Sequence, residues 1–362
     1  MRRSLQLGLS LLPFLLTACS QPVRPTPPPP AQVAPVVAAP LPIAAGSAST
    51  PGTQLASPLL PAEKRAAFIT ETAAASGMTP AEVSSWLDQA QYQQSIINAI
   101  TRPAEGKPWK DYRPIFLTET RISQGRQFFA EHREELARVS AQSGVPAEII
   151  VAIIGVETSY GRIMGNYRVL DALYTLGFFF PRREEFFRGE LKNLFTLARK
   201  EGLDLATLKG SYAGAMGWGQ FMPSSYLEYG RDGDGDGRRD LRGSTRDAFA
   251  SVANYFAGHG WNTGQPAFVA AIADPGAAPF VPEDFVARYS LADLAARGYR
   301  PRDAGAPKLP ATLLTLEGVN GPEYWIGYPN FYVITRYNRS PMYAMAVHQL
   351  AGEIAAGAGA AP

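Results

Sequence analysis

From about residue 61 onward, the spacing of apolar and polar residues is that of a mainly helical protein. It predicts helices over Pro61–Ala75, Thr79–Tyr92, Thr118–Ser143, Pro146–Gly161, Leu170–Leu176, Glu184–Lys200, Ser244–Ala257 and Pro341–Ile354. Runs rich in β-branched and aromatic residues predict strands at Thr312–Leu316 and Tyr324–Ile326. Phe331–Arg336 fits a third strand or the start of a return to the core, and Lys107–Pro114 fits a loop. The fold class predicted is mainly α (α+β).

One acidic residue interrupts the apolar face of the helix predicted at Pro146–Gly161. Glu157 follows Ile153 by four positions and Ile150 by seven, so it continues their face instead of pointing to water. Partial burial and the nearby helix C-terminus both raise the pKa of such a carboxyl group. A carboxylic acid that stays protonated near neutral pH can act as a general acid. A buried glutamate paired with an arginine is the alternative.

The N-terminus has the features of an export signal followed by a lipid attachment site. An apolar run at Leu5–Leu16, too short for a permanent bilayer span, leads into LTAC and Cys19, the only cysteine. LTAC resembles a bacterial lipobox, so residues 1–18 are predicted to be a signal peptide. Acylation of Cys19 would then hold the protein at a membrane. Ser20 favours the outer membrane of a Gram-negative bacterium, facing the periplasm.

Composition separates a tether from a globular region. Residues 19–60 are rich in Pro and Ala and almost free of charged and aromatic residues, which predicts a disordered tether. The whole chain of 362 residues is 46% hydrophobic and 18% charged, with a formal charge of +2. Both units of charge fall in the predicted signal peptide, so the mature chain is neutral. No basic footprint for nucleic acid remains.

Several kinds of chemistry are excluded by residue types and spacing. The chain has 3 widely spaced histidines and no second cysteine, so it has no zinc pattern, and an acylated cysteine is no nucleophile. It has no G-x-S-x-G elbow, and the Gly-rich residues 210–226 lack the Lys-Ser/Thr ending of a phosphate-binding loop. What remains is a carboxyl group accompanied by aromatic and amide residues, which suit a sugar chain. Core packing is the alternative role for any single aromatic residue.

An acidic stretch, DGDGDGRRD at residues 232–240, matches the start of a calcium loop. Asp232, Asp234 and Asp236 alternate as in D-x-D-x-D-G, and such oxygen ligands favour calcium. Gly243 stands at the twelfth position, where such loops usually have an acidic residue, and the next acidic residue that could close the loop is Asp247. A structural calcium ion is therefore expected. A metal-free loop, with Asp247 as a helix-capping residue, is the alternative.

Four motifs carry a resemblance to the membrane-bound lytic murein transglycosylase B family. They are GVETSYG at 155–161, GSYAGAMGWGQFMPSSY at 210–226, SVANYFAGHGW at 251–261 and PNFYVITRYNRSPMYAMAV at 329–347. The resemblance runs from about Pro61 to near Ile354 and implies a lysozyme-like catalytic core with an added helical domain and a small β-containing domain. The predicted divisions are the helical and catalytic core at 61–260, the β-containing domain at 261–328, a return to the core at 329–355 and a tail at 356–362.

The resemblance also implies an activity. The family cleaves the β-1,4 bond between N-acetylmuramic acid and N-acetylglucosamine in peptidoglycan and leaves a 1,6-anhydromuramoyl product, with Glu157 as the single acid/base. No cofactor is required for that chemistry, and the expected partners are glycan strands and, in addition, cell-wall synthases or hydrolases. A hydrolytic muramidase of the same fold, a non-catalytic peptidoglycan-binding lipoprotein and a calcium sensor are the alternatives.

Site residues follow from the motif positions. By resemblance, the polar and site-lining residues are Ser211, Gln220, Tyr337 and Asn338, and the aromatic lining is Tyr112, Tyr255 and Tyr343. The resemblance also supports a longer metal loop that closes at Asp247 and to which Arg238 contributes a carbonyl oxygen. Where the family often has Tyr, this chain has Phe186 and Phe187, so a stacking face is kept but the hydroxyl is lost.

Overall fold

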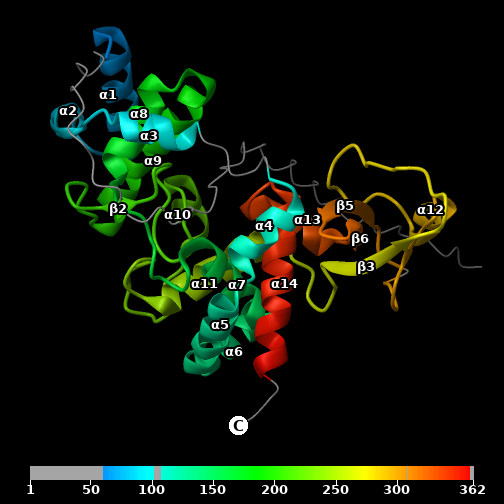
Figure 1. The fold of residues 1–362 in the computed structure, drawn as a ribbon. Coiled ribbons are helices and arrows are strands. Elements are labelled where there is room, and N and C mark those ends of the chain that lie inside the picture. The colour runs from blue at the N-terminus through cyan, green and yellow to red at the C-terminus, as the bar shows by residue number, and fades with distance from the viewer. Residues whose placement is uncertain (1–59, 102–106, 307, 359–362) are drawn as a thin grey trace, which may run out of the picture. The chain divides into compact units, whose positions relative to one another are not determined.

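The computed structural model describes residues 60–101, 107–306 and 308–358 (Figure 1). The predicted signal peptide, Cys19 and all but the last residue of the predicted tether lie outside the described residues. The N-terminal helices are α1 (Ala62–Ser76), α2 (Pro80–Gln89), α3 (Gln94–Ile100), α4 (Trp109–Phe116), α5 (Glu119–Glu131), α6 (Arg133–Ser143) and α7 (Ala147–Thr158). The later helices are α8 (Val169–Phe179), α9 (Glu184–Glu201), α10 (Pro223–Tyr229), α11 (Thr245–Gly258), α12 (Leu291–Ala296), α13 (Pro329–Tyr337) and α14 (Pro341–Ala358), with a 3-10 turn, η2, at Pro181–Arg183.

Helix α7 lies at the centre of the main hydrophobic core. Its residues Ile149 to Val156 are buried, and it packs against α5, α6, α11 and α14. Helix α14 comes from the far end of the chain and also contacts α4 and α5, as Figure 1 shows. A second group of helices forms around α9, which packs against α1, α8 and α10. The sequence therefore brings a C-terminal helix directly onto the helix that carries Glu157.

A small antiparallel sheet is formed by β3 (Phe268–Ala273), β4 (Tyr299–Pro301), β5 (Thr312–Gly318) and β6 (Gly321–Gly327), in the order β4-β3-β6-β5. In the β5–β6 hairpin Leu313 pairs with Ile326, and Leu314 pairs with Trp325. Because side chains alternate across a strand, the first pair joins a separate small core and the second packs on the main core. A two-stranded ladder, β1 (Tyr167–Arg168) with β2 (Lys209–Gly210), lies before the Gly-rich segment.

Two expectations about elements were wrong, and for a third segment one of two alternatives was wrong. Lys107–Pro114 is not a loop, because Trp109, Tyr112 and Phe116 recur on one face and form helix α4, with each side chain 1% exposed. The single helix expected over Thr118–Ser143 is two helices, α5 and α6, which meet at His132. Of the two alternatives for Phe331–Arg336, the strand is wrong: the segment is part of α13, which begins at Pro329 and packs Phe331 and Ile334 into the main core.

Within the described ranges, no single helix is long and apolar enough to cross a membrane. Helices α6 and α7 satisfy length and composition only as a pair bent by 112°, and α7 is a core helix.

Candidate active site

The carboxyl group of Glu157 stands at the last turn of α7. The helix ends at Thr158, three residues before the expected stop at Gly161, because Ser159 and Tyr160 already adopt left-handed backbone angles (φ of 50° and 60°). Glu157 is partly buried, whereas its helix neighbours Val156 and Thr158 are fully buried. The chain thus places one acid, partly exposed, at the end of a buried apolar helix.

Burial and one hydrogen bond determine the ionisation of Glu157. Burial raises the pKa of this carboxyl group from 4.5 to about 8, and a hydrogen bond from Tyr343 opposes the rise. The hydroxyl of Tyr343 donates to Oε1 of Glu157 at 2.6 Å. Within residues 60–101, 107–306 and 308–358, no ion pair reaches Glu157. The glutamate–arginine alternative is therefore not the arrangement seen here.

Two aromatic residues, from α13 and α14, lie next to this acid, and a third, from α11, packs on one of them. Tyr343 is fully buried, and both it and Tyr337 have pKa values raised well above normal, mainly by burial and next by the nearby Glu157 carboxylate. The hydroxyl of Tyr337 donates to the carbonyl oxygen of Gly219 at 2.6 Å. The ring of Tyr255 meets that of Tyr337 edge-on, with centroids 4.7 Å apart. These aromatic residues are thus held rigidly by packing and by hydrogen bonds to the backbone.

Tyr112 and Asn338 are two further residues that the sequence predicted to line the site. Tyr112, on α4, is 1% exposed and close enough to Tyr343 to raise its pKa. Helix α4 is tied to the small sheet, since Trp109 Nε1 donates to Glu323 Oε2 at 3.2 Å. Asn338 directly follows α13, is 2% exposed, and its Oδ1 accepts the Ser340 N–H at 3.0 Å. The sequence pattern did not predict this hydrogen bond between Trp109 and Glu323.

The Gly-rich segment places Ser211 and Gln220 differently. Ser211 is 4% exposed, and its hydroxyl accepts the backbone N–H of Ala215 at 3.1 Å, so it holds a turn. Gln220 has a left-handed backbone (φ 49°), and its Nε2 donates to the carbonyls of Met164 and Gly217 at 3.2 and 3.1 Å. Gln220 is only partly buried, so it is the more accessible of the two.

Phe186 and Phe187 also differ from each other in exposure. Phe187 is fully buried, whereas Phe186 keeps partial exposure. The guanidinium of Arg183 lies over both rings, 4.3 Å from the centroid of Phe186 and 5.0 Å from that of Phe187. Only Phe186 therefore retains a face for stacking.

The acidic loop brings together Asp232, Asp234 and Asp247, each with one carboxylate oxygen within 4.8 Å of the others. Asp247 is 1% exposed, and burial followed by the nearby Asp234 and Asp232 carboxylates opposes its ionisation and raises its pKa. Its Oδ1 accepts the Gly233 N–H at 2.8 Å, and its Oδ2 that of Asp240 at 2.6 Å. A group of converging carboxylate oxygens fits a hard divalent cation such as calcium.

Other predicted loop residues lie outside this carboxylate group. Asp236 does not join it; its Oδ1 instead accepts the Arg238 N–H at 2.8 Å. The capping residue of α11 is Ser244, whose Oγ accepts the Asp247 N–H at 3.2 Å, whereas the Asp247 carboxylate accepts N–H groups of the loop and caps nothing. Asp247 therefore lies in the first turn of α11, and its carboxylate closes the loop.

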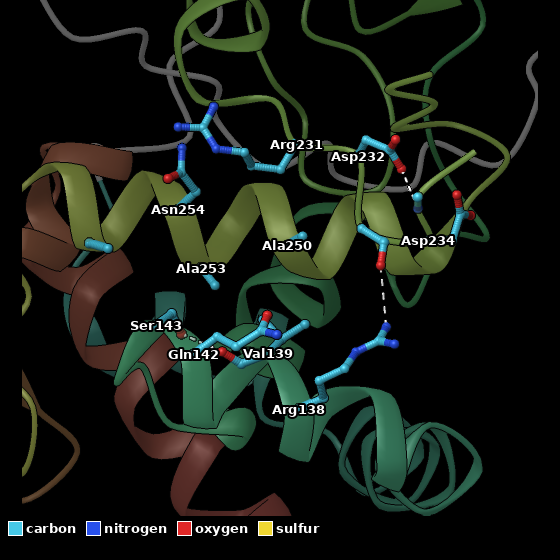
Figure 2. A pocket seen from close by; sticks show the side chains of 13 residues that line it. Arg138, Val139, Gln142, Ser143, Arg231, Asp232, Asp234, Ala250, Ala253 and Asn254 are labelled. Carbon is cyan, nitrogen blue, oxygen red and sulfur yellow. Dashed lines mark hydrogen bonds between the residues drawn. The ribbon is translucent and has the colours of Figure 1, made fainter. Parts of the chain in front are cut away.

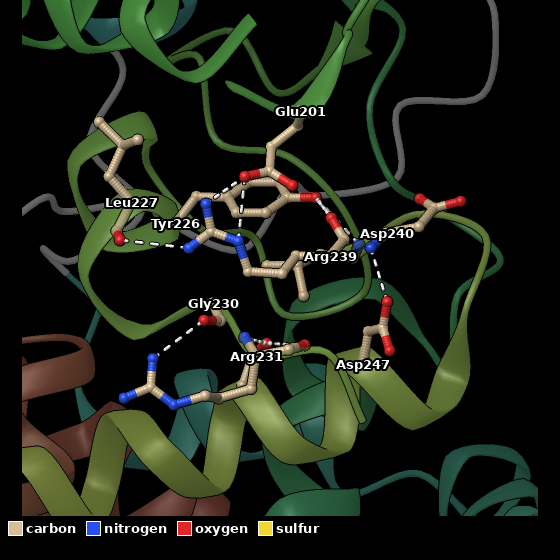
Figure 3. Close-up of polar contacts among 10 residues, drawn as sticks. Glu201, Tyr226, Leu227, Gly230, Arg231, Arg239, Asp240 and Asp247 are labelled. Carbon is tan, nitrogen blue, oxygen red and sulfur yellow. Dashed lines mark hydrogen bonds and ion pairs between the residues drawn. The ribbon is translucent and has the colours of Figure 1, made fainter. Parts of the chain in front are cut away.

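Two further features surround the loop. A cavity of about 540 Å³ lies between α6, α11 and residues 231–235 (Figure 2). Arg138 at its edge donates to the carbonyl of Gly233 at 3.3 Å, and none of the predicted glycan-contacting residues lines it. On the other side, Arg239 pairs with Glu201 of α9, and the Leu241 N–H donates to the Tyr226 hydroxyl at 3.1 Å (Figure 3). These contacts attach the loop to the catalytic core.

A mainly helical fold that presents one carboxyl group with a raised pKa among aromatic side chains is typical of lysozyme-like enzymes that cleave glycans. Comparison with known proteins makes this specific. Residues 61–352 match the family model described as transglycosylase SLT domain. The chain is 44% identical over 298 residues, 80% of its length and 81% of the relative's, to membrane-bound lytic murein transglycosylase B of Escherichia coli (strain K12). The chain therefore belongs to the SLT transglycosylase family and is a lytic transglycosylase, an enzyme that cleaves peptidoglycan.

Solved structures agree with this assignment and with the lysozyme-like fold. The catenated lytic transglycosylase SltB1 from Pseudomonas aeruginosa is 49% identical, with a TM-score of 0.78, over 83% of this chain and 99% of that one. The Escherichia coli lytic transglycosylase Slt35 in complex with calcium is 43% identical, with a TM-score of 0.75, over 81% and 93%. SltB3 from P. aeruginosa in complex with NAG-anhNAM-pentapeptide is 32% identical, with a TM-score of 0.71, over 83% and 81%.

Proposed function

We propose that this enzyme cleaves the β-1,4 bond between N-acetylmuramic acid and N-acetylglucosamine with Glu157 as its single acid/base, and that the product carries a 1,6-anhydromuramoyl end. The observation that carries the proposal is the carboxyl group of Glu157, with a pKa of about 8 and a single hydrogen bond from Tyr343. No second carboxyl group of the described chain contributes to that pKa shift. This differs from glycosidases that use two carboxyl groups.

The proton balance of the reaction needs only one acid. Protonated Glu157 donates its proton to the glycosidic oxygen as the bond from that oxygen to C1 of the muramoyl residue breaks. The carboxylate that remains accepts the Tyr343 hydrogen bond. It then takes the proton of the C6 hydroxyl while O6 bonds to C1, which closes the anhydro ring and restores the acid. No water is consumed, so the reaction is a lyase reaction.

The surrounding residues are proposed to hold the glycan. Tyr112, Tyr255, Tyr337 and Tyr343 supply the aromatic lining, and Ser211, Gln220 and Asn338 supply polar groups. The structure of SltB3 with NAG-anhNAM-pentapeptide supports this kind of substrate. A hydrolytic muramidase and a non-catalytic binding protein are not favoured by the relatives, which are named as lytic transglycosylases.

The acidic loop is proposed to bind one structural calcium ion through Asp232, Asp234 and Asp247, with the Arg238 carbonyl and Asp236 as further oxygen donors from the sequence pattern. The Slt35 structure in complex with calcium supports this choice of metal. The ion would neutralise carboxylates that otherwise repel one another. It takes no part in the proton transfers above.

The N-terminal region is proposed to anchor the enzyme in the outer membrane of a Gram-negative cell, facing the periplasm, through acylated Cys19. The Escherichia coli relative is named membrane-bound, which supports anchoring, although the solved relative SltB1 is also described as soluble. Residues 19–60 would act as the tether, 61–260 as the catalytic core and 261–328 as the β-containing domain. Cell-wall synthases or hydrolases are the proposed protein partners.

The test compares the purified parent with Glu157→Gln on isolated sacculi. The variant keeps the shape and a carbonyl acceptor for Tyr343 but has no proton to donate as an acid. It should bind sacculi like the parent and release no soluble muropeptides. If Glu157→Gln lyses sacculi at the parent rate, the catalytic assignment is wrong.

A further inference from the structure

The turn that directly follows Glu157 has an uncommon backbone conformation. Ser159, Tyr160 and Gly161 have φ angles of 50°, 60° and 79° in succession. A positive φ is uncommon outside glycine and is disfavoured for a bulky residue such as tyrosine. Space is also restricted, because a Cβ on Gly161 would lie 2.3 Å from the ring of Trp218. Contacts from neighbouring segments therefore keep this turn in its conformation.

Thr158 makes several of these contacts with one hydroxyl group. Its side chain is 1% exposed, and Oγ1 lies 3.0 Å from the carbonyl oxygen of Ile154 and 2.9 Å from that of Trp218. The same oxygen accepts the N–H of Gly161 at 3.0 Å. A hydroxyl has a single proton, so it donates to one carbonyl at a time while it accepts from Gly161. Thr158 thus joins the helix end, the turn and the Gly-rich segment.

The Gly-rich segment is in turn fixed on both sides. The backbone N–H and the indole Nε1 of Trp218 donate to carbonyls at positions 241 and 242, at 3.0 and 2.9 Å. The next residue, Gly219, accepts the Tyr337 hydroxyl at 2.6 Å. The bond between Thr158 and Trp218 therefore connects the end of the Glu157 helix to the backbone that holds Tyr337, an aromatic residue beside the acid.

We propose that Thr158 is a positioning residue for the reaction: its hydroxyl holds the last turn of α7 at a fixed distance from the Trp218–Gly219 backbone, and so places the Glu157 carboxyl group against the glycosidic oxygen. The hydrogen bonds of Thr158 go to backbone atoms, so it acts through the backbone and not by touching substrate. The inference rests on the proposed role of Glu157. The sequence motif alone did not single out Thr158.

The experiment compares Thr158→Val, which keeps the shape and removes the hydroxyl, with Thr158→Ser, which keeps the hydroxyl. A misplacement of about 1 Å at a reacting group can cost on the order of 100-fold in rate. We expect Thr158→Val to lower kcat by about 10- to 100-fold and to leave KM within about 2-fold, because the glycan-contacting side chains remain. Thr158→Ser should restore kcat to within about 3-fold of the parent. Soluble uncrosslinked glycan strands serve as substrate.

Thr175→Val is the matched control. Thr175 is also fully buried, and its hydroxyl accepts the Gln93 N–H at 3.0 Å, but it belongs to α8 and none of its hydrogen bonds involves the site. It should lower the melting temperature comparably and leave kcat unchanged. If Thr158→Val does not fold, Thr158→Ala is measured by the same criteria.

A Thr158→Val enzyme with parental kcat would overturn the proposal. So would a Thr175→Val enzyme that loses as much kcat for the same loss of melting temperature, because the effect would then be general stability. Failure of this proposal is separable from failure of the proposed function. The latter is decided by whether the parent makes anhydro products and Glu157→Gln does not.

Discussion

Removal of the Tyr343 hydroxyl should shift the pH dependence of catalysis in a defined direction. The hydroxyl donates to Glu157 Oε1 at 2.6 Å, and this bond lowers a pKa that burial raises to about 8. The pKa of Tyr343 is itself raised well above normal, so the hydroxyl remains a donor across the working pH range. In Tyr343→Phe the carboxylate loses its donor, and the pKa of Glu157 rises further.

The magnitude follows from the bond. A hydrogen bond to a charged group contributes about 1.5–3 kcal/mol, which corresponds to a pKa change of about 1–2 units. A general acid works in its protonated form, so kcat/KM of the parent should fall as pH rises through about 8, and this limb should move up by about 1–2 units in the variant. In the transition state Glu157 gives up its proton and becomes negatively charged. The variant lacks the Tyr343 hydrogen bond that stabilises this charge, so kcat should fall by about 10- to 100-fold.

The assay measures the release of muropeptides from soluble glycan strands over a pH range that extends roughly three units below and three units above the parent limb, so that a limb displaced upward by about 1–2 units stays inside the range. Tyr299→Phe is the control, since Tyr299 is 2% exposed and donates to the carbonyl of Ala278 at 2.9 Å in the small sheet unit. Its alkaline limb should match that of the parent. An unchanged limb in Tyr343→Phe, or one displaced to lower pH, would refute the reasoning.

Other consequences are independent of that bond. The folded-state pKa of Glu157 is about 8 and its ordinary value is 4.5, so the folded state retains the proton and stability is lost as pH rises from about 4.5 to 8. Glu157→Gln should therefore melt higher than the parent at pH 8 and above but match it near pH 4, and equal differences at both pH values would contradict this. Removal of calcium with EDTA from a calcium-loaded sample should lower the melting temperature, and Asp247→Asn should abolish the difference; an unchanged midpoint argues against a structural ion. Cys19→Ser should move the enzyme from the membrane fraction to the soluble fraction, and its retention at the membrane would disprove the anchor.

Local signals in the sequence predicted the helix of Glu157 well. Glu157 follows Ile153 by four positions and Ile150 by seven, a spacing within one helix that can be read from the sequence. In the structure both isoleucines are buried on that helix, as predicted. The hydrogen bond from Tyr343 joins residues 186 positions apart, and no local pattern encodes such a contact. The family resemblance named Tyr343 as part of the lining, but only the structure gives its bond to the acid.

The wrong elements have physical causes. Two prolines, Pro108 just before α4 and Pro114 inside it, favoured a loop, yet the spacing of Trp109, Tyr112 and Phe116 was a helical signal. The β-branched and aromatic residues of α13 resemble a strand, although Pro329 marks a helix start. The break at His132 has no glycine or proline to announce it. There the ring of His132 packs against Phe128 and Phe249, and such tertiary contacts are not readable from local propensity.

The most direct test of the account is product analysis by mass spectrometry on purified sacculi digested by the parent, with Glu157→Gln beside it. The account predicts muropeptides that end in 1,6-anhydromuramic acid from the parent and no release by the variant. Reducing-end muramic acid as the only product would contradict a lyase that uses Glu157 as its lone acid/base.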